Sequence, residues 1–211
     1  MTRLTVPDPD ERGDLGSFVA RVVRLDQAAL VRLQAGGGTV TAWAATPFDV
    51  LATRTVHGAL EPADVTVPAP SLLTALTVER ADTVDPGSGG LWHGELPPAE
   101  GWQPVDDVPA AELERLTERG LAVARENAGP MGPPASLLDQ TVLTVSAGAA
   151  RPAVKVPLRC LFALSGMGFL GDTGPDAGVV RVSATGTWLR LDARYGAVVR
   201  RRITALPLLV G

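Results

Sequence analysis

Two segments of the chain, 89 residues apart, share one pattern of valines, proline and leucines. Residues 65–73 read VTVPAPSLL and residues 154–162 read VKVPLRCLF, so both fit V-x-V-P-x-x-x-L-[LF]. In each segment the alternating valines predict a strand that ends at the proline, and the residues that follow predict a short helix. The match reflects either a duplicated unit or chance, because apolar residues make up 45% of the chain. We adopt the duplication, since strand-like sequence flanks both copies.

The N-terminal half predicts a tail that is followed by strands and one helix. Residues 1–14 lack periodicity and predict a flexible tail. Alternating apolar and polar residues predict a strand at 17–23, and the spacing of apolar residues predicts a helix at 25–35. Residues 39–46 and 49–60 predict a hairpin. The first unit is therefore expected to have the order β-α-β-β.

The C-terminal half predicts one long helix and several strands. Residues 108–127 follow two aspartates and place their leucines on one side, which is typical of an amphipathic helix. Residues 140–147 and 152–158 predict a hairpin, and a short helix is expected at 159–167. Alternation at 178–203 predicts two or three further strands.

These elements predict an α+β protein with mainly antiparallel sheets and short helices. Two related β-α-β-β units are expected, linked by the longer amphipathic helix. The predicted parts are a flexible tail at 1–14, an N-terminal β-α-β-β domain at 15–104, and a linking helix with a β-rich C-terminal domain at 105–211. The apolar segment 204–211 is expected to pack onto the body of the protein.

The hexad GMGFLG at 166–171 matches G-x-G-x-x-G, the spacing of a loop that binds a dinucleotide pyrophosphate. Such a loop works because it joins a strand to the first turn of a helix, whose free N–H groups face the phosphates. Here the preceding residues predict a helix and the following DTGPDAG cannot begin one. A helix C-terminus presents carbonyl oxygens, which repel phosphate. We therefore expect the hexad to end a helix, and we expect no nucleotide cofactor.

His93 and Glu95 are the candidate catalytic residues. They stand two apart in LWHGEL at 91–96, which predicts a short strand, so their side chains would share a face as base and acid. The alternative is a strand at a loop edge with solvated polar groups. The chain has two histidines and one cysteine, Cys160, without metal-ligand spacing, so no metal site is expected. Cys160 is expected to be buried.

Arginines concentrate near the C-terminus and are the candidate partner-binding residues. On a strand, Arg200 and Arg202 would share a face and could hold a phosphate or an acidic partner, with Arg194 and Tyr195 nearby. The alternative is a solvated strand edge that prevents unwanted pairing.

The succession of FVARVVRLDQAALVRL, VTAWAATPFDVLATRTV and VKVPLRCLFALSGMGFLG resembles an uncharacterised actinobacterial family of unknown function, from about Ser17 onward. That resemblance implies a source and no activity. The strands that run into VP and a leucine-rich helix also resemble the repeated β-α-β-β-β units of bacterial DNA sliding clamps. The chain holds too few such units for a clamp subunit. For helices that should line a DNA channel, the sequence offers Arg32, Arg80 and Arg159 as candidates.

The sequence favours a non-enzymatic cytoplasmic binding or assembly module with a protein partner or a second copy of itself. The alternatives are an enzyme of unrecognised type with an acid/base pair in an inter-domain cleft, or a clamp-like DNA-associated protein. A net charge of −4 gives no long-range attraction to nucleic acid or to an anionic membrane. A polar N-terminus, no apolar run of membrane-spanning length and a single cysteine predict a cytoplasmic location.

Overall fold

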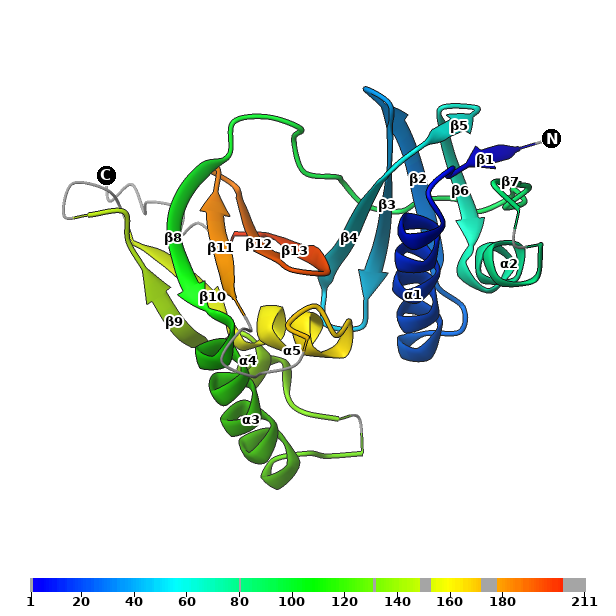
Figure 1. Cartoon of the computed structure of the whole chain (residues 1–211). Coiled ribbons are helices and arrows are strands. Elements are labelled where there is room, and N and C mark those ends of the chain that lie inside the picture. The colour runs from blue at the N-terminus through cyan, green and yellow to red at the C-terminus, as the bar shows by residue number, and fades with distance from the viewer. Residues whose placement is uncertain (1, 80, 131, 149–152, 172–177, 203–211) are drawn as a thin grey trace, which may run out of the picture.

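The structure is a computed structural model that describes residues 2–202 apart from 80, 131, 149–152 and 172–177 (Figure 1). The helical segments are α1 (Pro9–Leu25), α2 (Ala69–Thr74), the π-helical turn η1 (Ala75–Glu79), α3 (Ala110–Glu126), α4 (Ala135–Leu138) and α5 (Leu158–Gly166). The strands are β1 (Arg3–Thr5), β2 (Leu30–Gly36), β3 (Thr39–Thr46), β4 (Val50–His57), β5 (Ala59–Glu61), β6 (Asp64–Pro68), β7 (Thr83–Val84), β8 (Gln103–Pro109), β9 (Thr141–Val145), β10 (Val154–Pro157), β11 (Val179–Ala184), β12 (Trp188–Ala193) and β13 (Gly196–Arg201). Segment 204–211, predicted to pack onto the body, lies outside the described residues.

One antiparallel sheet of eight strands runs through both halves of the chain. Its order is β6-β2-β3-β4-β13-β12-β11-β8, so four strands of the N-terminal half are followed by four of the C-terminal half. The halves meet where β4 pairs with β13, with Ala52 opposite Val198 and Leu51 opposite Val199. We call this line of pairing the seam. Two smaller antiparallel sheets have the orders β5-β1-β7 and β10-β9, and the fold is the α+β class that the sequence predicts.

Both copies of the shared V-x-V-P pattern have the local structure predicted for them. Strand β6 ends at Pro68 and α2 begins at the next residue, while β10 ends at Pro157 and α5 follows it. Proline suits these positions because it has no N–H to donate and its fixed φ fits the entry to a helix. Whether the two copies arose by duplication stays a prediction.

Helix α1 occupies residues for which the sequence predicts a tail and a strand, and both predictions are wrong there. Its buried residues Leu15, Phe18, Val19 and Val22 recur at helical spacing. Asp8 caps the helix by accepting hydrogen bonds from the N–H groups of Asp10 and Glu11. Ahead of the cap, residues 3–5 form β1 between β5 and β7. The alternation at 17–23 is too short to distinguish the two periods.

Strand β2 stands where the sequence predicts a helix at 25–35. Val31 and Leu33 are fully buried, while Leu30 and Arg32 are less so, which is the two-residue period of a strand. Pairing with β3 on one side and β6 on the other decides the outcome. Apolar residues at 29, 30 and 33 fit a helical face equally well, so tertiary pairing overrides the local pattern.

Helices α1 and α5 lie on the same face of the eight-stranded sheet, one on each side of the seam (Figure 1). Helix α2 packs beside α1, and α3 packs beside α5. The sheet residues beneath them include Ala42, Ala44 and Ala52, which are fully buried. Their small side chains let the helices approach the strands closely, as a densely packed interior requires. One hydrophobic cluster therefore runs across the seam.

The opposite face of the sheet is covered by the segment that links the two halves, residues 85–102, which we call the strap. Trp92, Leu96 and Trp102 of the strap pack against Trp43 of β3 and Trp188 of β12. The strap has no strand at 91–96, so that prediction is wrong. At its start the N–H of Gly90 donates to the Thr66 carbonyl of edge strand β6, 3.1 Å away. The four tryptophans of the chain thus meet here, two from the strap and two from the sheet beneath it.

Candidate functional site

The glycine hexad at 166–171 ends helix α5, as the sequence predicts. Gly166 is the last residue of the helix, and Gly168 has φ +59, the left-handed conformation that closes many helices. The N–H of Gly168 donates to the Ser165 carbonyl and that of Phe169 to the Leu164 carbonyl. The hexad thus presents a helix C-terminus, and the prediction that it ends a helix is confirmed.

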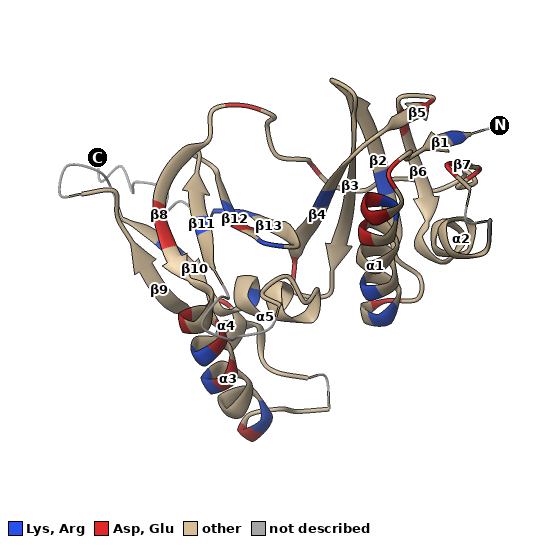
Figure 2. Ribbon diagram, viewed as in Figure 1, with Lys and Arg blue, Asp and Glu red and all other residues tan. Residues whose placement is uncertain are grey.

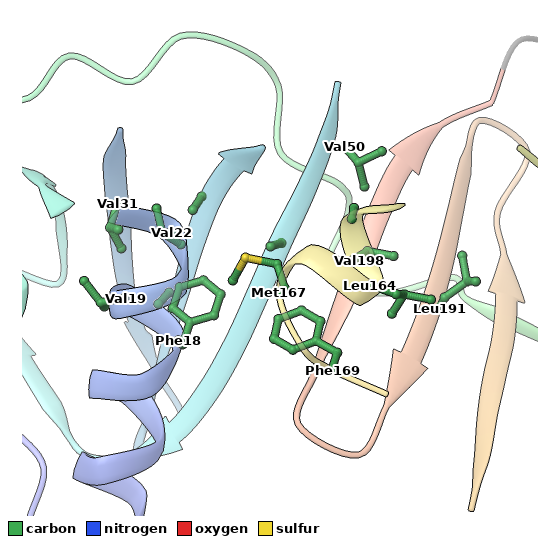
Figure 3. Close-up of a cluster of buried hydrophobic side chains, with 14 of the residues drawn as sticks. Phe18, Val19, Val22, Val31, Val50, Leu164, Met167, Phe169, Leu191 and Val198 are labelled. Atoms are coloured by element: carbon green, nitrogen blue, oxygen red, sulfur yellow. The ribbon is translucent and has the colours of Figure 1, made fainter. Parts of the chain in front are cut away.

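The hexad instead docks onto helix α1 of the other half. Arg21 donates to the Met167 carbonyl at 2.7 Å and Arg24 to the Gly166 carbonyl at 3.0 Å. These carbonyls lie at the negative end of α5, where cationic donors are stabilising. Phe18 and Phe169 stack with ring centroids 6.3 Å apart, and Met167 lies beside them (Figure 3). The hexad therefore joins the halves on the helical side of the seam.

A network of two arginines and two aspartates joins the halves at one end of the seam. Arg159 of α5 donates to Asp139 and to the Phe48 carbonyl, each at 2.8 Å, and only 8% of its side chain is exposed. Arg200 of β13 lies 3.1 Å from Asp139 and 3.5 Å from Asp49. Arg159 is thus the buried member that links the turn after β3 to helix α5.

The structure divides the predicted partner-binding arginines between two places. Arg200 is 11% exposed and already paired in this network, and Arg202 donates to the Thr185 carbonyl at 2.9 Å. Arg194 and Tyr195 lie at the opposite end of the β12–β13 hairpin, 5.4 Å apart from guanidinium to ring centroid. The four residues therefore do not form one surface, and their role in binding stays a prediction.

Arg201, between the two predicted arginines, points to the strap side of the sheet. It pairs with Glu95 of the strap at 2.8 Å and lies 5.9 Å from the ring centroid of Trp188. Sequence reasoning passed over Arg201 in favour of its neighbours. The alternation along β13 could have identified Arg201, because Val199 and Arg201 lie on one face of the strand and Arg200 lies on the other.

A hollow of about 610 Å³ opens between the strap and the sheet at this end of the seam. It has an apolar floor and a charged rim, and we call it the seam hollow. Its lining includes Leu51, His93, Glu95, Trp188, Val199 and Arg201. The structure thus brings the predicted pair His93 and Glu95 to one hollow together with arginines of β13. Glu95 pairs with Arg201, and the acid/base role of His93 and Glu95 stays a prediction.

His57 and Glu11 form a contact whose charge state depends on pH. The Glu11 carboxylate lies 2.7 Å from His57 Nδ1. This hydrogen bond raises the pKa of His57 and lowers the pKa of Glu11. The raised His57 pKa stabilises the fold below the pKa of the unfolded histidine, and that contribution is lost as pH rises through the folded value. The lowered Glu11 pKa acts in the opposite sense, so its contribution is lost as pH falls through the folded value.

We therefore expect Glu11→Gln to lower the pKa of His57 toward its ordinary value. Proton NMR of the His57 ring across a pH titration measures the midpoint directly. Glu118→Gln on the exposed side of α3 is the matched control and should leave it in place. An unchanged His57 midpoint in Glu11→Gln would show that the pair does not form.

Cys160, the single cysteine of the chain, is buried in the core. Burial raises the pKa of Cys160 to about 12, so its thiol stays protonated near neutral pH and is unreactive, in agreement with the predicted burial. Across the described parts of the chain, no group of three or more His, Cys, Asp or Glu residues could hold a metal ion. No helix among those same residues is long and apolar enough to cross a bilayer.

The arginines considered for a DNA channel do not make a basic helical surface. Arg32 lies on β2 and pairs with Asp64 at 2.7 Å, and Arg159 is buried in its network. Arg80 lies outside the described residues. Acidic and basic residues both occur along α1 and α3, the longest helices described (Figure 2). These two helices therefore present mixed charge.

Comparison with solved structures shows that the chain has the fold of bacterial sliding clamps. The DNA polymerase sliding clamp of Caulobacter crescentus matches with a TM-score of 0.59 and 17% identity, over 98% of this chain and 67% of that one. The clamp of Pseudomonas aeruginosa matches with a TM-score of 0.58 and 16% identity, over 99% and 66%. The DNA polymerase III beta subunit of Thermotoga maritima matches with a TM-score of 0.53 and 14% identity, over 99% and 66%. The chain spans about two thirds of the length of these proteins.

A short sequence match also occurs with the SH3 and PX domain-containing protein 2A of Danio rerio, 27% identical over 81 residues. It covers 38% of this chain and 7% of that protein, so it shows no family.

Two family models cover nearly the whole chain. The model described as domain of unknown function DUF8010 matches residues 1–92, and the model described as domain of unknown function DUF8185 matches residues 97–205. The boundary between the matches falls within the strap. Both resemblances found in the sequence are confirmed, to proteins of unknown function and to the clamp fold, while the actinobacterial source stays a prediction. Because the second model covers just over half of the chain, the protein belongs to the DUF8185 family.

Proposed function

We propose that the protein is a non-enzymatic binding module that holds a segment of a partner protein in the seam hollow. The observation that carries this proposal is the convergence of three parts of the chain on one open hollow. Leu51 comes from the N-terminal half, Val199 and Arg201 from the C-terminal half, and Glu95 from the strap. Solved proteins of this fold are named as clamps of DNA polymerase, which supports an assembly role in place of chemistry.

The composition of the hollow suits a peptide with an apolar side chain beside a carboxylate. Leu51 is partly exposed and supplies apolar contact area above the buried Trp188 and Val199. Arginine side chains such as Arg201 often provide much of the binding energy at protein interfaces. The pair of Arg201 and Glu95 is 62% and 61% exposed, so it contributes only about 0–1 kcal/mol. A carboxylate of the partner can therefore replace Glu95 on Arg201 at little cost.

The proposal is tested by charge reversal at Arg201. Tagged wild-type protein, Arg201→Glu and the control Arg115→Glu are used to capture partners from extracts of the native host. Arg115 is suitable because it is 67% exposed on α3, away from the hollow. We expect wild type and the control to retain the same protein, and Arg201→Glu to retain at least about tenfold less of it. Equal capture by all three proteins would contradict the proposal.

A clamp-like association with DNA is the alternative suggested by the fold. The mixed charge of the long helices makes it the less favoured one. Non-specific DNA binding depends on lysines and arginines that neutralise phosphates. Arg159 is buried, and charges of both signs occur along α1 and α3. We expect micromolar protein to leave the mobility of a short DNA duplex unchanged in low salt. Retention that weakens as salt is raised would favour the DNA alternative.

A further inference from the structure

A second hollow, of about 300 Å³, lies on the helical side of the seam and shares no lining residue with the seam hollow. Helix α1, strand β4, the hexad loop and the β12–β13 turn meet around it. Its polar lining consists of Asp14, Ser17, Arg21, Arg54 and Tyr195. We call it the arginine hollow. Its volume is at the lower limit for small-molecule sites, so it suits a small ligand.

Two partly buried guanidinium groups and one carboxylate line the arginine hollow. Arg54 Nη2 donates to Asp14, and Arg21 Nη1 donates to the Met167 carbonyl. Only 18% of the Arg54 side chain is exposed. Among the described lining residues, Arg21 and Arg54 carry two positive charges against one negative charge on Asp14. The hollow is therefore net positive in partly desolvated surroundings, where electrostatic attraction is stronger than in water.

Several N–H donors of Arg21 and Arg54 have no acceptor among the described residues. A guanidinium has five N–H donors, and the described contacts satisfy few of them. Arg54 Nε is buried without a hydrogen-bond partner among the described residues, so the terminal Nη groups are the Arg54 donors that face a ligand. An unmade hydrogen bond at a buried polar atom costs free energy. The Ser17 hydroxyl and the Tyr195 phenol are further possible donors on the same hollow.

From these observations we propose that the arginine hollow binds a small oxyanion, the phosphate or carboxylate group of a small metabolite. Forked guanidinium donors match the paired oxygens of both groups. The exposed ring of Tyr195 gives the rest of such a molecule an apolar surface, and the buried rings of Phe18 and Phe169 lie beneath the hollow. Asp14 is then a competitor of the ligand, because its carboxylate occupies Arg54 in the unliganded hollow. The proposal is independent of the seam hollow and of any protein partner.

Tyr195 allows a site-specific test because it is the only tyrosine of the chain. Protein labelled with 3-fluorotyrosine should give one fluorine NMR line, which is followed while inorganic phosphate or acetate replaces chloride at constant ionic strength. We expect a saturable shift with at least one of the two anions. Phosphate alone identifies a phosphate group as the ligand chemistry, and acetate alone identifies a carboxylate. A line that drifts without saturation for both anions would overturn the proposal.

Variants of the lining make the test specific. Arg54→Gln and Arg21→Gln should each weaken binding at least about tenfold, whereas Arg115→Gln should leave it unchanged. Asp14→Asn should strengthen binding, by about tenfold, because it removes the competing carboxylate. A misfolded protein would not bind the anion more tightly. The gain in Asp14→Asn therefore tests the proposal even if the arginine variants lose their structure. Binding that is indifferent to Arg54 and Asp14 would overturn the proposal.

The chain's own carboxylates provide the last control. Asp172 and Asp176 follow the hexad directly in sequence and lie outside the described residues. Asp172→Asn with Asp176→Asn should leave the affinity of the wild-type hollow unchanged within a factor of about two. Anion binding that appears only in this double variant would overturn the proposal. The carboxylates of the chain would then be the acceptors for the two arginines, in place of a ligand.

Discussion

Gly168→Ala is expected to lower the free energy of unfolding by about 3 kcal/mol, because two separate costs add. Gly168 has φ +59, a conformation that alanine adopts only under strain. An added Cβ would lie 1.2 Å from Arg21 Nη1, so Arg21 would have to leave the Met167 carbonyl. Urea-induced unfolding measures the loss, and thermal unfolding should show it as a fall in Tm of roughly 6–12 °C.

The matched control for this prediction is Gly16→Ala in helix α1. A Cβ at Gly16 meets nothing within 4 Å and the residue is helical, so alanine should be neutral or stabilise the fold by up to about 1 kcal/mol. The contrast separates the loss of a required glycine from a general effect of alanine. A Gly168→Ala protein as stable as wild type would show that the hexad does not dock onto Arg21 as described.

Arg159→Met is expected to lower the free energy of unfolding by about 3 kcal/mol. The substitution keeps the apolar stem of the side chain and removes the donors to Asp139 and to the Phe48 carbonyl. The expected loss lies at the lower end for a broken buried pair, because Asp139 is 38% exposed and keeps Arg200 as a partner. Urea-induced unfolding again provides the measurement.

A double-mutant cycle decides whether this loss comes from the ion pair. Arg159→Met combined with Asp139→Asn should lose less than the sum of the two single losses, by more than about 1 kcal/mol. Arg115→Met is the surface control, because its pair with Glu112 is exposed and should matter by less than about 0.5 kcal/mol. Additive losses at Arg159 and Asp139 would mean that the two residues do not form a coupled buried pair.

Local sequence patterns predicted the elements whose neighbours follow them closely in the chain. The hairpins of β3 with β4 and of β9 with β10 are as predicted, and so are helices α3 and α5. The end of α5 at the hexad was also predictable, because the type of loop depends on what precedes and follows it. In these cases the turn residues and the period of the apolar residues point to the same structure.

The failures occur where distant segments decide the local structure. Strand β2 has an ambiguous apolar pattern, and pairing with β3 and β6 selects the strand. The strap has no period to detect, because Trp92 and Trp102 pack against strands that lie far away in sequence.

At the candidate site the sequence identified the right segments, but it did not single out Arg201. Both His93 and the arginine-rich strand border the seam hollow. A sequence places Arg200 and Arg202 on one face of a strand, but it does not say which face meets the helices. In the structure Arg200 pairs with Asp139 and Arg201 pairs with Glu95, and both arginines line the hollow.

The most direct measurement of the proposed function is photo-crosslinking in the native host. Benzoylphenylalanine is placed at position 93, on the rim of the seam hollow, and at position 119, on the exposed side of α3. The proposed function predicts a discrete protein adduct from position 93 and none of that adduct from position 119. No adduct from position 93, or the same adduct from both positions, would contradict the claim that the seam hollow receives a protein partner.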